Sequence, residues 1–326
     1  MVTLLCPVRG CGAPLSRAGR ALACPRGHRF DVARSGYCNL LQPHERRSRR
    51  PGDSAAALAA RRRLFDQGHG DWLVPHLLAA FDALRLPPGA AVLDVGCGEG
   101  FYLGTLARER RIEAHGLDIS APAIDLAARR YPAATWIVAN ADRTLPYAAG
   151  SFGLALALTS RLNPAELRRV LAPGVSAART APAAPAADAA AVAKGAGGFL
   201  LLAVPGADDL VELRAAVLGE GQLRDRLRPA LATLAADFEL VRHAAVSTRL
   251  HLDAGSARDL LAATYRAVRH RESRRAEGLV EPAVPAGPTE PTGPAGPAAI
   301  EVTTSRDLAT LKALPPRGPL GRRVIE

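Results

Sequence analysis

The sequence contains no apolar run of the roughly 18 or more residues that a membrane-spanning helix needs, so we expect no membrane partner. Residues 1–5 are uncharged and lead directly into a cysteine motif, which is unlike a secretory signal peptide. The five cysteines are an odd number, and four of them lie within residues 1–38. This pattern argues against a secreted disulfide framework and favours a cytoplasmic protein that binds a metal.

Lysine is almost missing, because Lys194 and Lys312 are the only lysines among 42 basic residues. A general preference for arginine says little by itself, so the informative feature is where the arginines lie. Residues 1–63 carry 13 Arg against three acidic residues, a balance of +10, whereas residues 64–326 balance to +1. A basic segment attached to a near-neutral body predicts an anionic partner for that segment.

Composition divides the chain into four parts. Residues 1–40 are rich in cysteine, and residues 41–88 form a basic linker with two expected helices. Residues 89–312 alternate between apolar and helical runs, and residues 313–326 form a tail rich in Pro, Gly and Arg. The alternation predicts an α/β domain with a parallel, doubly wound sheet.

The expected strands and helices of the α/β part follow from short apolar runs and amphipathic runs. We expect strands at 90–95, 113–118, 135–139, 152–158, 198–204, 243–252 and 300–304. We expect helices at 54–65, 72–84, 101–110, 121–130, 164–171 and 257–269. Two low-complexity insertions interrupt the body, an Ala-rich one at 172–198 and one at 279–299. In the second, Pro recurs at every third residue, which is typical of an extended polyproline II linker.

Four residues of the types that bind zinc fall in two pairs near the start of the chain. Cys6 and Cys11 form the first pair. Cys24 and His28 form the second, after a spacer of 12 residues. Tetrahedral Zn²⁺ takes four sulfur or nitrogen ligands, which two tight turns joined by a hairpin can supply. The pattern predicts one structural zinc that stabilises a module too small to fold on its own core. Cys38 is expected to be buried rather than a ligand.

A glycine-rich turn follows the first strand of the body. It comes after Asp94 and reads Gly96-Cys97-Gly98-Glu99-Gly100. Its spacing differs from the G-x-G-x-x-G of dinucleotide-binding proteins, and no phosphate-loop lysine is present. The pattern is that of class I S-adenosylmethionine (SAM) methyltransferases, which have a Rossmann-like fold. We expect Asp118, followed by Ile119, to accept both ribose hydroxyls, and Asn140-Ala141-Asp142 to meet the adenine.

The zinc module, helical linker and SAM domain together resemble the bacterial 23S rRNA guanine-N1 methyltransferases, a family with members that confer macrolide resistance. The resemblance covers about residues 4–170 and 197–270. Its most specific stretches are 24–41, 47–54, 60–62, 68–69, 205–206 and 210–213. It implies SAM as the cofactor, 23S rRNA as the partner and N1 of a guanine in a hairpin as the methyl acceptor.

The chain departs from the family pattern at several positions. The first zinc pair is C-x4-C, where the family usually has C-x2-C. Gly70 stands where the family has an aromatic residue that lines the SAM site, and we count this position in the cofactor site. Asp209 stands where the family has a histidine, and the end of the fourth strand reads Leu158-Thr159-Ser160-Arg161. The residues expected to contact the target base therefore follow the family pattern less closely than the residues of the cofactor loop do.

Guanine N1 carries a proton, so its methylation needs a base or stabilisation of the charge that develops on O6. Asp142 and Asp209 are the candidate bases near the expected cleft. Arginines of the linker are expected to bind RNA phosphates: Arg46, Arg47, Arg49, Arg50, Arg61, Arg62 and Arg63. Two alternatives stay open, a small-molecule SAM methyltransferase and a non-catalytic RNA-binding relative. A homodimer is compatible with the sequence, which does not decide the oligomeric state.

Overall fold

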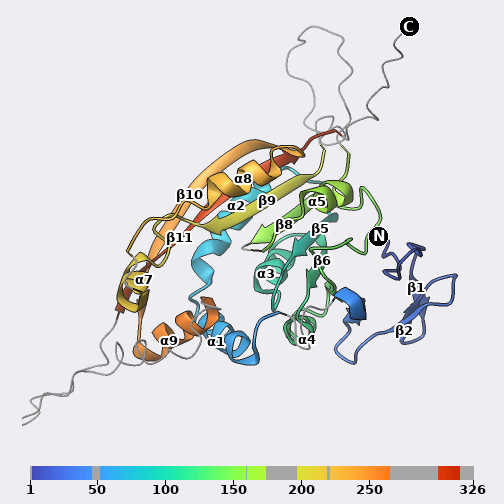
Figure 1. Cartoon of the computed structure of the whole chain (residues 1–326), viewed down its shortest axis with the longest axis horizontal. Coiled ribbons are helices and arrows are strands. Elements are labelled where there is room, and N and C mark those ends of the chain that lie inside the picture. Colours follow the sequence, from blue (N-terminus) through green and yellow to red (C-terminus); the bar gives the residue numbers. More distant parts are fainter. Residues whose placement is uncertain are drawn as a thin grey trace, which may run out of the picture.

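The computed structural model describes residues 2–45, 52–158, 160–173, 197–218, 221–264 and 300–315. A sheet with helices on both faces forms the body, and a small β module lies at one end of it (Figure 1). Arg46, Arg47, Arg49, Arg50, the 279–299 insertion and most of the 172–198 insertion lie outside the described residues. Within the described ranges, every helix is too short or too polar to cross a membrane.

The main sheet has eight strands in the order β10-β11-β9-β8-β5-β6-β7-β4. The strands of its central part are β5 (Ala90–Val95), β6 (Ile112–Asp118), β7 (Thr135–Val138), β8 (Leu154–Leu158) and β9 (Phe199–Pro205). These five strands are parallel, as the sequence predicts. Parallel strands place their carboxyl ends, and the loops that follow them, at one edge of the sheet, where α/β proteins bind ligands.

The prediction of an all-parallel sheet is wrong at one side. β11 (Ile300–Ala313) runs antiparallel to both β9 and β10 (Phe238–Leu252). Both outer strands are also longer than the predicted 243–252 and 300–304. Most of β10 is exposed or half-buried and β11 contains the polar run Thr303–Asp307, so neither strand reads as one continuous apolar segment. Because β11 continues through Ala313, the body also extends one residue past the predicted boundary at 312.

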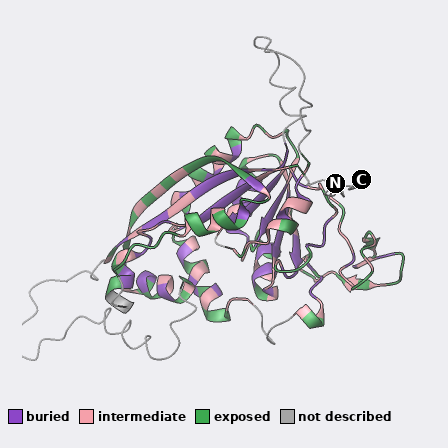
Figure 2. Ribbon diagram, turned by 45° about the horizontal axis from the view of Figure 1, so that its top comes forward, coloured by how far each residue is buried: buried purple, intermediate pink, exposed green. Residues whose placement is uncertain are grey.

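Neighbouring residues of β5 face opposite sides of the sheet, and each side is covered. Val92 packs with α2 (Val74–Ala83), α3 (Phe101–Glu109) and α4 (Ala121–Arg130). Leu93 packs on the other side with α5 (Pro164–Val170) and α8 (Leu227–Leu234). Strands with two covered faces are buried along most of their length, as Figure 2 shows for the centre of the sheet.

Helix α1 (Ala55–Asp66) begins where the sequence predicts. Ser54 is its N-cap, and the Ser54 hydroxyl accepts a hydrogen bond from the backbone N–H of Ala57 at 3.1 Å. A short 3₁₀ turn, η2 (Asp71–Leu73), then leads into α2. α1 packs against α9 (Ala254–Thr264), where Arg63 binds Asp259. The linker helices therefore belong to the body. Helices α7 (Val211–Leu218) and α8 were not among the predicted elements.

The N-terminal module holds the antiparallel strands β1 (Ser16–Ala18), β2 (Ala21–Ala23) and β3 (Arg29–Asp31). Its anchors to the body include the following contacts at its two ends. The Val2 backbone N–H donates to Glu113 at 2.8 Å, and β4 (Cys38–Asn39) adds a parallel edge strand beside β7. Cys38 is buried there, as predicted. After β4 the chain turns through η1 (Pro43–Glu45).

Candidate functional site

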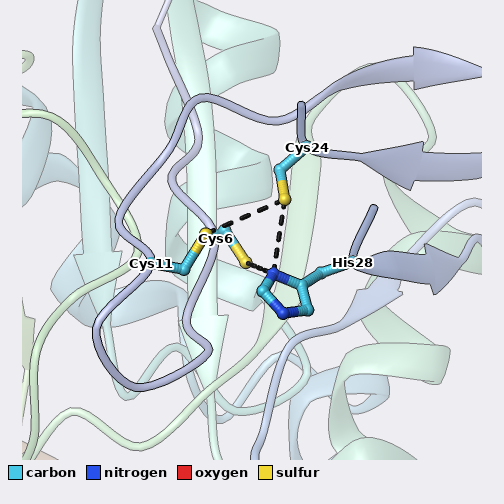
Figure 3. Close-up of side chains that lie close together, drawn as sticks. All are labelled: Cys6, Cys11, Cys24 and His28. Carbon is cyan, nitrogen blue, oxygen red and sulfur yellow. Dashed lines mark hydrogen bonds between the residues drawn. The ribbon is translucent and has the colours of Figure 1, made fainter. Parts of the chain in front are cut away.

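The structure brings Cys6, Cys11, Cys24 and His28 together. The sulfur atoms of Cys6 and Cys24 each lie 3.4 Å from Nδ1 of His28, and the sulfurs of Cys11 and Cys24 are 3.8 Å apart. All four donor atoms lie within 4.8 Å of one another, and their side chains converge on one point (Figure 3). Sulfur ligands 2.3 Å from a tetrahedral zinc are about 3.8 Å apart. The donor set therefore fits a zinc ion.

Two tight turns produce this convergence. In the first, the Cys11 N–H donates to the Val8 carbonyl, and in the second, the Gly27 N–H donates to the Cys24 carbonyl. Gly27 has φ +85°, a left-handed conformation that a side chain disfavours. Burial opposes ionisation of Cys24, but hydrogen bonds from the backbone N–H groups of His28 and Arg26 prevail and lower its pKa to about 6. The thiolate is the form that binds zinc.

The glycine-rich turn between β5 and α3 is tightly packed against neighbouring residues. Gly96, Gly98 and Gly100 all have positive φ, at +74°, +56° and +75°. A Cβ built on Gly96 would lie 2.6 Å from Cβ of Ser160, and one built on Gly100 would lie 2.9 Å from Cζ3 of Trp136. The backbone conformation favours glycine at all three positions, and the lack of space requires it at Gly96 and Gly100.

Asp118 joins this turn to the end of β6. Its Oδ2 accepts the Gly98 N–H at 3.0 Å, and its Oδ1 accepts the Ser120 N–H at 2.8 Å. Burial raises the pKa of Asp118, while these two hydrogen bonds oppose the rise. A carboxylate has about four acceptor positions, so both oxygens keep capacity for ribose hydroxyls. Ile119 follows directly and packs, half-buried, against the α2–α3–α4 side of the sheet.

A cavity of about 220 Å³ opens beside the glycine turn. Of the predicted cofactor residues, Gly70, Asp94, Gly96, Gly98 and Glu99 line it. The remaining wall is largely apolar and aromatic and comes from α1, η2, α3, β10 and α9, with the residues Leu64, Phe65, Trp72, Tyr102, Leu250, Leu252 and Leu260 among them. This combination of a few polar groups and a large apolar wall is typical of a small-molecule site.

Gly70 lies against an aromatic pair. A Cβ built on Gly70 would lie 2.6 Å from Cε1 of Phe65 and 3.2 Å from Cε1 of Phe101. The Phe65 and Phe101 rings are stacked, with centroids 4.2 Å apart and planes 9° apart. The ring that the family pattern expects at position 70 has no space here, because Phe65 lies where a side chain of residue 70 would begin.

Two carboxyl groups in the cavity wall have buried oxygens without hydrogen-bond partners. They are Oδ1 of Asp94 and both side-chain oxygens of Glu99. Burial, together with the charge of Asp118, raises the pKa of Asp94 to about 8, and burial also raises that of Glu99. A positively charged ligand would supply the missing partners. The ammonium group of SAM can donate such hydrogen bonds and its sulfonium adds a second positive charge, so these residues fit SAM.

The raised pKa of Asp94 predicts how stability depends on pH. Its pKa of about 8 in the folded protein lies above the usual aspartate pKa of 3.8, so the folded protein retains a proton that the unfolded chain releases. The contribution of Asp94 to the free energy of unfolding is therefore fully present below pH 4 and is lost as the pH rises towards 8. We expect Asp94→Asn to gain stability relative to wild type between pH 5 and 8, measured as melting temperature without cofactor. Equal pH slopes would contradict this assignment.

Asp82→Asn is the matched control for that measurement. Asp82 is half exposed and binds Arg110 at 2.7 Å, which lowers its pKa. It is already ionised between pH 5 and 8, so its replacement shifts stability without changing the slope over this window.

The predicted adenine-side residues lie outside the cavity described above. Asn140 donates from Nδ2 to the Glu45 carbonyl at 3.2 Å and accepts the Asp142 N–H at 2.9 Å. The Ala141 carbonyl accepts a hydrogen bond from Asn163. The structure thus places Asn140 and Ala141 at the end of β7, beyond β6 and Asp118 in the sheet order. Their role towards adenine stays a prediction.

The structure does not bring either predicted catalytic aspartate to the cavity. Asp142 binds Arg161 at 3.0 Å at the end of β7. Asp209 is buried after β9, where its Oδ1 accepts hydrogen bonds from Arg306 at 2.7 Å and from the Ser305 N–H at 2.9 Å. Each carboxylate is thus paired with an arginine, Asp142 with Arg161 and Asp209 with Arg306. Arg306 lines the cavity.

The three consecutive arginines of α1 have different surroundings. Arg62 and Arg63 are about half exposed, at 51% and 57% of their side chains, and bind Asp66 and Asp259. Arg61 is 25% exposed, binds Asp53 and lines the cavity. Arg61 shares a helix face with the buried Leu58 and Leu64, at spacings of three residues. That spacing was the signal that could have separated Arg61 from a surface RNA-binding role.

Comparisons with known proteins match both parts of the chain. A family model described as RlmA, N-terminal, a zinc ribbon, matches residues 4–49, and one described as a methyltransferase domain matches residues 92–174. A 23S rRNA (guanine(748)-N(1))-methyltransferase of Streptomyces fradiae is 38% identical over 256 residues, which is 77% of this chain and 80% of that protein.

Two further relatives carry the name 23S rRNA (guanine-N(1)-)-methyltransferase provisionally. The one from Micromonospora griseorubida is 35% identical and covers 64% of this chain and 68% of its own length. The one from Bacillus subtilis, YxjB, is 29% identical and covers 64% of this chain and 66% of its own length.

The zinc donors lie in the part of the chain that matches the zinc ribbon, and the buried carboxylates lie in the part that matches the methyltransferase domain. The protein is a SAM-dependent methyltransferase with a zinc ribbon at its N-terminal end. With 38% identity across most of both sequences, the chain belongs to the family of 23S rRNA (guanine-N1)-methyltransferases.

Proposed function

We propose that this protein transfers the methyl group of SAM to N1 of a guanine in a hairpin of 23S rRNA. The observation that carries the proposal is the 38% identity to the Streptomyces fradiae enzyme over 80% of its length. The cavity supports it, because beyond the carboxyl groups its wall is apolar and aromatic, with Trp72, Tyr102 and Leu250. Flat bases stack on walls of this kind once they leave the helix.

SAM supplies an electrophilic methyl group, so the protein's task is to align the acceptor and exclude water. Asp94 and Glu99 would hold the positive charges of the cofactor, and Asp118 its ribose. The acceptor nitrogen must lose a proton while charge develops on O6. We propose that Arg306 stabilises that charge and that Asp209 acts by orienting Arg306, since the two are 2.7 Å apart. Asp142 remains a candidate base.

RNA binding is proposed for the basic N-terminal region. Arg62 and Arg63 lie on an exposed face of α1, and the stretch that contains Arg46, Arg47, Arg49 and Arg50 precedes this helix. Arginine binds phosphate through paired hydrogen bonds, with an affinity that falls as salt rises. A cytoplasmic location follows from an rRNA substrate. A homodimer also remains a proposal, and light scattering of the purified protein measures it.

The experiment is methyl transfer from labelled SAM to 23S rRNA that lacks the modification. We expect label in 23S rRNA and none in 16S rRNA under the same conditions. Measured SAM binding without transfer to 23S rRNA would overturn the proposed substrate while leaving the cofactor intact. Transfer to a small molecule instead would point to the alternative class of enzyme.

A further inference from the structure

Arg61 stands apart from the other arginines of the linker because its guanidinium faces the cofactor cavity. Its Nη1 lies 3.8 Å from the position of a Cβ built on Gly98, so it reaches the glycine turn itself. Its Nη2 binds Asp53, whereas its Nε is buried and has no hydrogen-bond partner. A buried, unpartnered donor on a charged side chain is costly unless a ligand completes it.

The charges around the cavity show what such a ligand must carry. Asp94 and Glu99 suit the two cationic groups of SAM. The methionine part of SAM also carries a carboxylate, which needs a cation. Among the described residues that line the cavity, Arg61 and Arg306 are the arginines. Arg306 uses Nη1 for Asp209 and for the Ser305 carbonyl, whereas Arg61 binds Asp53 through Nη2, has no hydrogen-bond partner at Nε, and places Nη1 beside Gly98.

We propose that Arg61 binds the methionine carboxylate of SAM. Asp53 is its counter-ion in the free protein and binds it through Nη2. The segment that carries Asp53 is fixed at the same site, because a Cβ built on Gly52 would lie 2.5 Å from Cβ of Ser120, two residues after Asp118. The helical linker therefore completes the cofactor site, and Arg61 is a cofactor residue rather than an RNA contact.

The test compares the binding of SAM with that of decarboxylated SAM, which lacks only this carboxylate. Calorimetry without RNA measures both dissociation constants, so the outcome does not depend on the proposed rRNA substrate. A charge-assisted pair contributes enough for a roughly 10- to 100-fold difference. We expect wild type to prefer SAM by about this factor. Arg61→Met should lose the preference by weakening SAM while changing decarboxylated SAM by less than about threefold.

Three variants separate this role from a structural one. Arg61→Lys keeps a charge and should retain part of the preference. Asp53→Asn removes the ion pair but not the guanidinium, and should keep SAM binding. Arg129→Met is the matched control, since Arg129 is 69% exposed and binds Asp125 on α4 away from the cavity. Equal weakening of both ligands in Arg61→Met, or a wild type without preference, would overturn the proposal.

Discussion

Replacement of Cys24 by Ser is expected to remove zinc from the protein and unfold the N-terminal module. Cys24 is central to the donor group, because its sulfur contacts both His28 and Cys11. The strands β1, β2 and β3 have three residues each, and Ala21 is the only one of these residues that is fully buried. A module with so little core depends on its metal, whose binding contributes on the order of 10 kcal/mol in small zinc modules.

The measurement is metal content per chain after dialysis, together with thermal unfolding. Wild type should retain about one zinc, and Cys24→Ser close to none. SAM binding should survive, because the cavity is built by the body. Cys38→Ser is the matched control: this thiol is also buried, but it lies outside the donor group, 4.0 Å from the Phe30 carbonyl. Full zinc content in Cys24→Ser would contradict the ligand set.

Gly100→Ala is expected to destabilise the body and to abolish cofactor binding. An alanine at φ +75° costs about 1–2 kcal/mol through its backbone conformation. Its Cβ would also clash with Trp136, which is buried and fixed by a hydrogen bond from Nε1 to the Tyr131 carbonyl at 2.8 Å. Overpacking of a fixed ring adds about 1–3 kcal/mol. Relief of the clash would displace the glycine turn, which we propose contacts the cofactor.

Gly89→Ala separates the two causes. Gly89 has φ +81°, close to that of Gly100, but a Cβ there would meet nothing within 4 Å. It should lose only the conformational part, about 1–2 kcal/mol, and bind SAM as wild type does. Chemical denaturation and calorimetry measure both quantities. Equal losses of stability in the two variants would show that the contact with Trp136 is unimportant.

The sequence predicts well those parts of the site whose ligands or turn residues all lie within one short segment of the chain. Cys6, Cys11, Cys24 and His28 have the spacing of zinc ligands, and the turn from Gly96 to Gly100 needs glycine at fixed positions. Backbone conformation within a few residues decides both features, and no distant part of the chain is needed to recognise them.

The parts that the sequence does not predict depend on contacts between distant segments. Arg306 reaches the cavity from β11, which follows the 265–299 segment and pairs antiparallel with β9. Asp209 follows β9 and binds Arg306, a contact across 97 positions of sequence. Arg61 is one of three consecutive arginines; its spacing from Leu58 and Leu64 indicates an inward-facing position, but the cavity that it faces is formed by distant segments. Such pairings are set by tertiary structure, so local patterns do not contain them.

The central claim is that this protein methylates N1 of a guanine in 23S rRNA. Its most direct test is digestion of the reacted rRNA to nucleosides, with mass spectrometry to identify the methylated product and primer extension to locate it. We predict 1-methylguanosine at one hairpin position, where primer extension stops because N1 lies on the base-pairing edge. Methylation of another atom, another base or no base at all would contradict it.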